Sequence, residues 1–258
     1  MGQKVVFLDI DGTIYNHEKK IPIATKKAVK KLQDNGVIVS IATGRAPFMF
    51  QDLLTELNIS TYISFNGQFV VHEGEVIHQN PIALNQLEEI TKFSIKNKHP
   101  LVYQSIHDMK SSVSDHPYIT KGMESLKREH PLVDTEYYKQ QTIFQVLLFN
   151  TEDEQATYED KFEHLKFVRW HQFSCDVMPF IGSKAHGIEQ FIQAMEIDWK
   201  DTYAFGDGLN DIEMIEKVNT GVAMGNSVDA VKAVADYVTD DVDNDGLSKA
   251  IKHLSLIN

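Results

Sequence analysis

Residues 4–13 of the chain read KVVFLDIDGT, and the interpretation of the other segments depends on this stretch. The apolar run Val5–Leu8 is continuous, which predicts a strand buried on both faces of a parallel sheet. The run ends at Asp9 and Asp11, which can face the same pocket, and Gly12 permits a sharp turn. Neighbouring carboxylates raise each other's pKa unless a cation or ordered donors neutralise them. The stretch therefore predicts a site for a hard metal ion, and a surface turn is the alternative interpretation.

The composition is that of a globular protein. The chain has 258 residues, enough for one large domain or two modest ones, with 42% hydrophobic and 24% charged residues. A formal net charge of -12 argues against a nucleic-acid-binding surface, which must supply positive charge to phosphates. The single cysteine, Cys175, excludes an intramolecular disulfide. Because we find no secretion leader and no apolar run of bilayer length, we expect a cytoplasmic protein without a membrane partner.

A second strand end follows after one helix. Apolar residues recur at helical spacing in Ile23–Asn35, and Val37–Ala42 is another buried strand that ends at Thr43 and Gly44. Strand, helix and strand with short links form a βαβ unit, whose two strands are parallel. Their carboxyl ends share one edge of the sheet, so we expect Thr43 and Gly44 to lie close to Asp9.

The alternation of strands and helices is interrupted in the middle of the chain. We expect an α/β, Rossmann-like parallel-sheet core made of residues 1–82 and 182–258, and an inserted, smaller α+β cap domain at 83–181. In the insert, Asn85 and Glu88 resemble a capping box at the start of an amphipathic helix. In the insert we expect strands at 101–106, 143–149, 166–170 and 175–178, and helices near 118–128 and 154–164. Six histidines fall in the insert at spacings that match no metal motif, and we interpret them as surface or core residues: His99, His107, His116, His130, His164 and His171.

Four segments point at one edge of the predicted sheet. They are DIDGT at 9–13, ATGR at 42–45, Lys184 at a helix start and GDGLND at 206–211. This combination, in this order, resembles the four motifs of the haloacid dehalogenase superfamily of phosphotransferases. The long insert between the second motif and Lys184 resembles the Cof-like branch with a type IIB cap. Many members of that branch dephosphorylate sugar phosphates and related small metabolites.

The resemblance implies a Mg²⁺-dependent phosphatase that acts on small phosphorylated metabolites through an aspartyl-phosphate. Asp9 would be the nucleophile, and Asp11 would protonate the leaving oxygen and then deprotonate water. The resemblance assigns these two roles, because the spacing alone cannot. The metal ligands that it implies are Asp9, the backbone carbonyl of Asp11, and Asp207, with Asp211 binding a metal water or orienting Lys184. The groups that would hold the phosphoryl oxygens are Thr43, Gly44, Lys184 and Asn210.

Other functions are compatible with part of the pattern. A phosphomutase or another phosphotransferase would use the same phosphorylated Asp9, and the motifs do not separate it from a phosphatase. A phospho-accepting regulatory module also pairs acids with Thr and Lys, but it needs neither a cap nor a water-activating acid such as Asp11. A haloalkanoic acid dehalogenase has no use for the acidic segment at 206–211.

Several features stay open from the sequence alone. Ala185 follows Lys184 where relatives often have Gly, and Arg45 and Asn66 could serve either the site or the contact between core and cap. Specificity should come from loops of the cap, and the candidates there are His107, Asp108, Lys110, His116 and Tyr118. The sequence alone identifies neither the substrate nor the oligomeric state.

Overall fold

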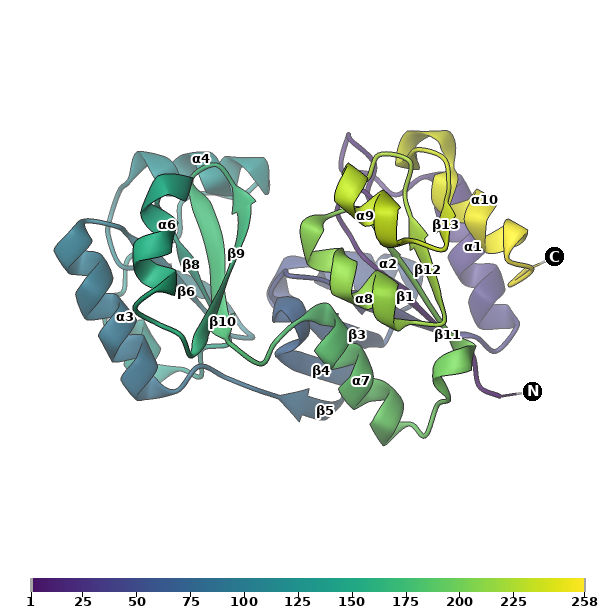
Figure 1. Cartoon of the computed structure of the whole chain (residues 1–258), viewed down its shortest axis with the longest axis horizontal. Helices are drawn as coiled ribbons and strands as arrows, with labels where there is room; N and C mark the ends of the chain where they lie inside the picture. Colours follow the sequence, from purple (N-terminus) through teal and green to yellow (C-terminus); the bar gives the residue numbers. More distant parts are fainter. Residues whose placement is uncertain (1, 258) are drawn as a thin grey trace. The chain divides into compact units, whose positions relative to one another are not determined.

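The computed structural model describes residues 2–257, which form two compact units. The first unit contains the chain up to Arg45, Phe50–Gln79 and the chain from Ser183 onward. The second unit contains Asn80–Gly182 together with Ala46–Met49, a short segment that the sequence assigned to the core. In Figure 1 the first unit combines purple N-terminal segments with green and yellow C-terminal ones, and the second unit is mainly teal.

The first unit is built on an eight-stranded sheet with the order β13-β12-β11-β1-β2-β3-β4-β5. Neighbouring strands from β13 to β3 are parallel, and β4 and β5 extend the sheet as an antiparallel hairpin. This arrangement confirms the predicted α/β fold with a parallel-sheet core. The strands span β1 Val5–Leu8, β2 Ile38–Ala42, β3 Thr61–Ser64, β4 Phe69–His72, β5 Glu75–Gln79, β11 Thr202–Gly206, β12 Thr220–Ala223 and β13 Tyr237–Val238.

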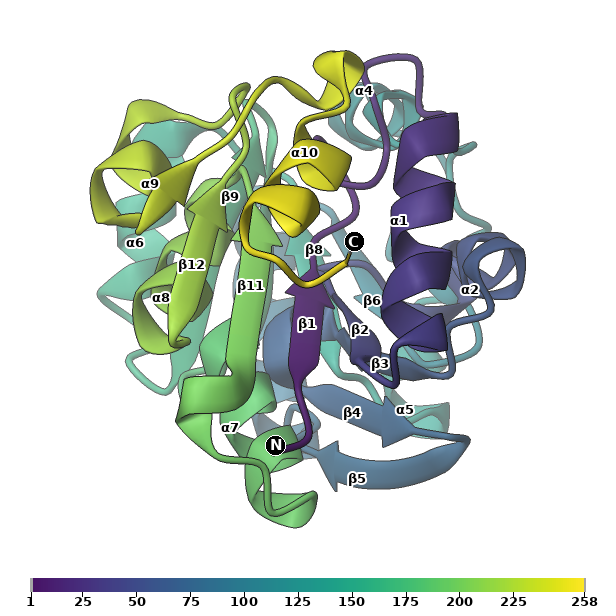
Figure 2. The same ribbon diagram turned by 90° about the vertical axis from the view of Figure 1, so that its right-hand side faces the viewer.

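Strand β1 lies in the middle of this sheet and is covered on both faces (Figure 2). Val6 and Leu8 pack in a cluster with α1, α2 and α10, whereas Val5 and Phe7 pack with α7, α8 and α9. All four side chains are completely buried, which explains why this strand has no polar alternation. The helices span α1 Ile23–Asp34, α2 Gln51–Leu57, α7 Lys184–Ala194, α8 Ile212–Lys217, α9 Asp229–Val234 and α10 Gly246–His253, with short 3-10 helices at Phe65–Gly67, Trp199–Asp201, Leu209–Asp211 and Val242–Asn244.

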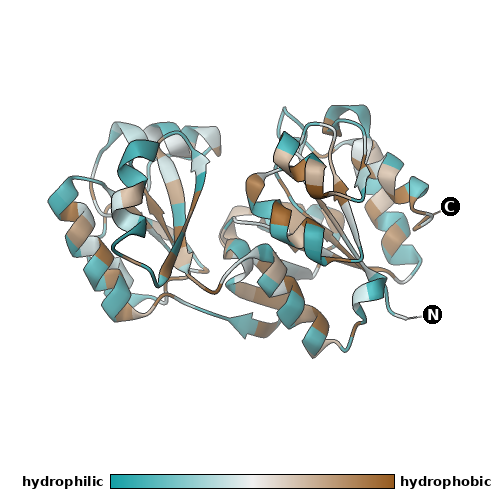
Figure 3. Cartoon of the chain, viewed as in Figure 1, coloured by the Kyte–Doolittle hydropathy of each residue, from teal (hydrophilic) through white to brown (hydrophobic). Residues whose placement is uncertain are grey.

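The second unit contains a five-stranded antiparallel sheet with the order β7-β6-β8-β10-β9. Leu101 and Tyr103 of β6 face one cluster with α3, and Val102 faces another with α4. Teal and brown segments alternate along α3 and α7 in Figure 3, as expected for helices that bury one face. The elements span β6 Leu101–Gln104, β7 Met109–Ser111, β8 Gln145–Leu148, β9 Leu165–His171, β10 Ser174–Pro179, α3 Leu84–Asn97, α4 Pro117–Ser125, α5 Tyr137–Gln140, α6 Glu152–Glu159 and a 3-10 helix at Pro47–Met49.

Some local predictions in this unit were wrong. The N-cap of helix α3 is Ala83, two residues before the predicted Asn85, and it makes no side-chain cap, so Asn85 does not form a capping box with Glu88. The capping box of the unit is instead formed by Thr151 and Glu154 at the start of α6. Strand β7 was not predicted, because three residues are too few for a periodic pattern. None of the helices in the described part of the chain is both long and apolar enough to cross a membrane.

Candidate active site

The candidate site lies at the carboxyl edge of the parallel sheet in the first unit. Because β1 pairs with β2 on one side and β11 on the other, the residues after these three strands come together. The backbone N–H of Asp9 donates to the carbonyl of Phe205 at 3.0 Å, which extends the strand ladder to the first acid. Asp9 is only 7% exposed, and Thr43, after β2, is buried as well. The predicted convergence of these segments is therefore present in the structure.

Lys184 joins two of the predicted acids. Its Nζ donates to Oδ1 of Asp9 and to Oδ1 of Asp211, each at 2.6 Å, and its side chain is completely buried. Ser183 caps the helix that begins at Lys184 by accepting from the N–H of His186. The helix therefore starts normally with Ala185 as its second residue. The two carboxylates outweigh burial and raise the pKa of Lys184, so the ammonium is charged.

Asp211 organises the loop after β11. Its Oδ2 accepts from the N–H groups of Asp207 and Gly208, each at 2.9 Å, while Oδ1 accepts from Lys184. Both oxygens of Asp211 are thus engaged within the protein. Of the two roles open for Asp211, this geometry favours orienting Lys184 and the loop.

Gly12 allows Asp207 to approach β1 closely. Its φ is +82°, a conformation that favours glycine, and a Cβ at this position would overlap the carboxylate of Asp207. Thr13, which is fully buried, donates through Oγ1 to Oδ1 of Asp207 at 3.2 Å. Asn226 donates through Nδ2 to the carbonyl of Gly12 at 2.8 Å. Neither Thr13 nor Asn226 was predicted as a site residue, and for Thr13 the DGT motif carried the signal.

Asp11 points toward two cations. Arg45 donates from Nε to Oδ2 and from Nη2 to Oδ1, each at 2.7 Å, and Lys19 donates from Nζ to Oδ1 at 2.5 Å. Burial alone would raise the pKa of Asp11, but Arg45 and Lys19 outweigh it and lower the pKa. Arg45 therefore belongs to the site, which the sequence left open. Lys19 was missed, because a lysine in a polar turn gives no signal of its own.

Asn66 connects two of the predicted phosphate-binding groups. Asn210 donates through Nδ2 to Oδ1 of Asn66 at 3.0 Å, and the Asn66 side chain also lies against Gly44. The N–H of Asn66 donates to the carbonyl of Thr43 at 3.0 Å. Phe65 and Asn66 both have positive φ values, of +50° and +51°. Consecutive left-handed residues are uncommon and typical of functional loops, so Asn66 belongs to the site as well.

The acids fit a hard divalent cation. Burial, followed by the charges of neighbouring carboxylates, raises the pKa of Asp207, and burial also raises the pKa of Asp9 against the opposing effect of Lys184. Oxygens of Asp9, Asp207 and Asp211 lie within 4.8 Å of one another. Carboxylate oxygens are the donors that Mg²⁺ prefers, and one divalent charge would relieve the repulsion between them.

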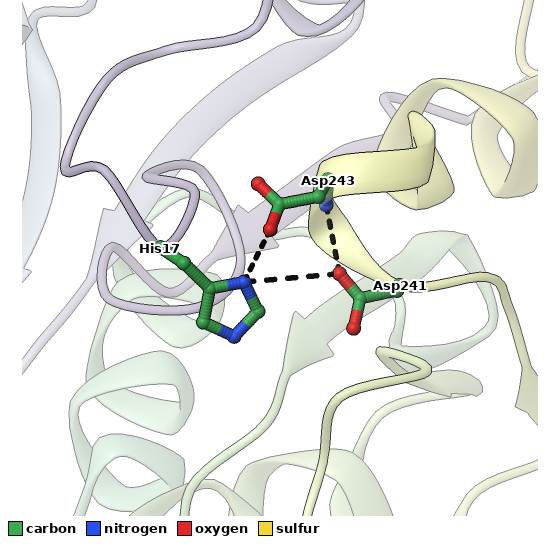
Figure 4. Close-up of side chains that lie close together, drawn as sticks. All are labelled: His17, Asp241 and Asp243. Atoms are coloured by element: carbon green, nitrogen blue, oxygen red, sulfur yellow. Dashed lines mark hydrogen bonds and ion pairs between the residues drawn. The ribbon is translucent and has the colours of Figure 1, made fainter.

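A second group of possible metal ligands lies at the surface (Figure 4). His17 Nδ1 is 2.5 Å from Oδ2 of Asp243 and 4.0 Å from Oδ1 of Asp241. The hydrogen bond to Asp243 raises the pKa of His17. Because His17 is 62% exposed and already paired, we interpret this group as a surface ion pair.

Four of the candidate specificity residues in the second unit form two contacting pairs, Asp108 with Lys110 and His116 with Tyr118. Asp108 accepts from Lys110 at 2.5 Å and also from the hydroxyl of Tyr137. His116 caps α4 by accepting from the N–H of Tyr118 at 3.3 Å. His116 therefore has a structural role, and Tyr137 is a buried partner of Asp108 that the sequence did not indicate.

Comparisons with known proteins identify the family. The family model of haloacid dehalogenase-like hydrolases matches residues 6–251. Putative phosphatase YkrA of Bacillus subtilis strain 168 is 48% identical over 257 residues, which cover 100% of both chains. The crystal structure of a hypothetical protein from Geobacillus kaustophilus HTA426 has a TM-score of 0.94 at 49% identity, covering 99% of this chain and 100% of that one. The structure of a sugar phosphatase of haloacid dehalogenase subclass IIB has a TM-score of 0.89 at 32% identity, covering 99% and 100%. These matches confirm the resemblance seen in the four motifs: the chain belongs to the haloacid dehalogenase-like hydrolases and is an enzyme of that family.

Proposed function

We propose that this protein is a Mg²⁺-dependent phosphatase that hydrolyses small phosphorylated metabolites, such as sugar phosphates, through an aspartyl-phosphate on Asp9. The observation that carries the proposal is the position of Asp9, at the end of the central strand and 2.6 Å from the buried ammonium of Lys184. Two similar proteins, one named a putative phosphatase and one a sugar phosphatase, support the same activity.

In the first step, the Asp9 carboxylate attacks phosphorus and the bond to the ester oxygen breaks. Asp11 donates a proton to that leaving oxygen. Lys184 and donors from Thr43, Gly44 and Asn210 would stabilise the charge on the phosphoryl oxygens. In the second step, Asp11 takes a proton from water, the hydroxide attacks phosphorus, and Asp9 is released together with inorganic phosphate.

Asp9, the backbone carbonyl of Asp11 and Asp207 would hold the metal. Asp211 would orient Lys184 and the loop that carries Asp207. When bound, Mg²⁺ would neutralise phosphoryl charge and orient the group for in-line attack. Thr13 and the loop bonds from Asp211 would keep the carboxylate of Asp207 in place for this role.

Hydrolysis of para-nitrophenyl phosphate tests the proposal. We expect turnover with Mg²⁺ and none with excess EDTA, restored when Mg²⁺ is added back. Rapid acid quenching should trap phosphate on the wild-type protein and not on Asp9→Asn. A wild-type protein that stays inactive with Mg²⁺ on a panel of phosphorylated metabolites would contradict the proposal. Products that retain phosphate on an acceptor other than water would instead indicate a phosphotransferase.

A further inference from the structure

One carboxylate of the site is bound by two cations. Arg45 forms a two-point contact with Asp11, and Lys19 adds a third hydrogen bond to the same group. A bidentate arginine by itself neutralises and orients a carboxylate. Counted together, Asp11, Arg45 and Lys19 therefore carry one net positive charge. Neither cation is fully exposed, since the side chain of Arg45 is 12% exposed and that of Lys19 is 30% exposed.

Lys19 is placed by a folded turn. Its backbone has a φ of +59°, which is uncommon for a residue other than glycine. The turn is held by the N–H of Lys19, which donates to the carbonyl of Asn16 at 2.8 Å, and by the side chain of Asn16, which accepts from the N–H of Lys20 at 2.9 Å. Lys20, the next residue, instead pairs with Glu18 at the surface. The turn thus directs one of two adjacent lysines to Asp11.

The two ends of the site differ in charge. At one end, Lys184 donates to Asp9 and Asp211, and a carboxylate oxygen of Asp207 lies within 4.8 Å of theirs, so this end is suited to a metal ion and a phosphoryl group. At the other end, two cations share Asp11. A substrate whose only charge is its phosphoryl group would match the first end alone.

We propose that Lys19 and Arg45 bind a second anionic group of the substrate, either a carboxylate or a second phosphate, a few bonds from the phosphoester. This inference rests on the proposed function and narrows its substrate class to phosphate monoesters with an additional anion. The incoming anion replaces the carboxylate of Asp11 on the two cations. Asp11, whose oxygens are both engaged in the structure, then becomes available to the ester oxygen.

Matched pairs of substrates test the inference. For the carboxylate, 3-phosphoglycerate is compared with glycerol 3-phosphate, which has a neutral hydroxymethyl group in its place. For the second phosphate, propane-1,3-diol bisphosphate is compared with its monophosphate. We expect kcat/KM to be about tenfold or more higher for the anionic member of at least one pair, because hydrogen bonds between charged groups are the strong ones. The pair that shows the preference identifies the anion.

Variants at the two lysines of the turn test whether the preference for anionic substrates depends on Lys19, with Lys20 as the control. Lys19→Gln should reduce the ratio of kcat/KM between anionic and neutral substrates by about tenfold, and Lys19→Arg should retain most of it. Lys20→Gln removes an equal charge from the same turn and should leave the ratio unchanged. Calorimetry with Asp9→Asn measures the same ratio as Kd values, without turnover.

The outcomes separate this inference from the proposed function. A wild-type enzyme that hydrolyses para-nitrophenyl phosphate, yet shows no preference in kcat/KM or Kd for either anionic substrate, overturns the inference and leaves the phosphatase intact. A preference that is equally lost in Lys20→Gln also overturns it, because the effect would then be general charge. An inactive wild-type protein that still binds the anionic member more tightly, through Lys19, supports the anion site and contradicts the phosphatase.

Discussion

The ammonium of Lys184 lies 2.6 Å from Oδ1 of Asp9, inside a protein whose other lysines are mostly solvated. A buried ion pair adds little net stability, but removing one partner leaves an uncompensated charge. We therefore expect Lys184→Met to reduce the free energy of unfolding by about 3–5 kcal/mol in urea titrations without Mg²⁺. Lys217→Met removes an exposed ion pair with Glu189 and should cost at most about 1 kcal/mol. Equal losses in the two variants would show that Lys184 is not the counterion of the buried acids.

Replacement of Asp9 should abolish chemistry while preserving the fold. Asn has nearly the same shape as Asp but cannot act as the nucleophile, so we expect Asp9→Asn to reduce kcat by about 10³-fold or more. Steady-state assays with para-nitrophenyl phosphate measure this loss, and circular dichroism checks folding. Asp34→Asn, an exposed change at the end of α1, serves as the control. Turnover that survives in Asp9→Asn would refute the nucleophile assignment.

Replacement of Asp11 should separate binding from proton transfer. We expect Asp11→Asn to lose about 10²- to 10⁴-fold in kcat, the usual contribution of a general acid and base. Vanadate, an analogue of the transferring phosphoryl group, should still inhibit this variant with a similar inhibition constant. Normal turnover in Asp11→Asn would exclude the acid and base role.

Two glycines with similar backbones allow a test of the metal site. Gly12 and Gly36 have φ values of +82° and +76°, but only at Gly12 would a Cβ meet another group, the carboxylate of Asp207. Both alanine variants should lose about 1 kcal/mol of stability from backbone strain. Only Gly12→Ala should also weaken activation by Mg²⁺, measured as a higher Mg²⁺ concentration at half-maximal activity. Equal Mg²⁺ requirements in the two variants would argue that Asp207 does not depend on this close approach.

Metal-free protein should become less stable as the pH rises. Burial raises the pKa of both Asp9 and Asp207, so the folded state holds protons that the unfolded chain has released. The stability from these groups is present below their ordinary pKa of about 4 and is lost as the pH rises toward neutrality. Asp11, with its lowered pKa, acts oppositely and loses its contribution as the pH falls. Between pH 5 and 8 we therefore expect the melting temperature of the metal-free protein to decrease.

Addition of Mg²⁺ should reverse this trend, because protons compete with the metal for the same oxygens. The increase in melting temperature on adding Mg²⁺ should be larger at pH 8 than at pH 5. In Asp207→Asn both the pH trend and the Mg²⁺ effect should become smaller. A Mg²⁺ effect that does not change with pH, or that persists in Asp207→Asn, would place the metal elsewhere.

The parts of the site that follow strands could be predicted from the sequence. Continuous apolar runs identified β1 and β11, and the parallel topology then brought Asp9 and Asp207 to one edge. The contacts made by loops could not be predicted. Lys19 reaches Asp11 only because a turn adopts a positive φ, and Asn66 reaches Asn210 through two consecutive left-handed residues. Hydrophobic periodicity contains no information about such backbone angles.

The capping error in the insert has a similar origin. Asn85 and Glu88 have the correct spacing, yet α3 starts one residue before Asn85, so that Asn85 lies inside the helix. Helix ends commonly shift by one or two residues, and this helix, which buries Leu87 and Ile90, begins before Asn85. Thr151 and Glu154 have the same spacing, but Thr151 directly precedes α6 and Glu154 lies in its acidic first turn.

The register of the central sheet also has a consequence for biosynthesis. Val5 of β1 pairs with Thr202 of β11, so the strand that carries Asp9 has no partner on that side until most of the chain has been made. At ordinary elongation rates, roughly 10–40 s separate the synthesis of Asp9 from that of Asp207. The second unit is encoded within this interval, during which the apolar edge of β1 that faces β11 has no partner. A nascent chain stalled before residue 202 should therefore engage chaperones through its N-terminal strands.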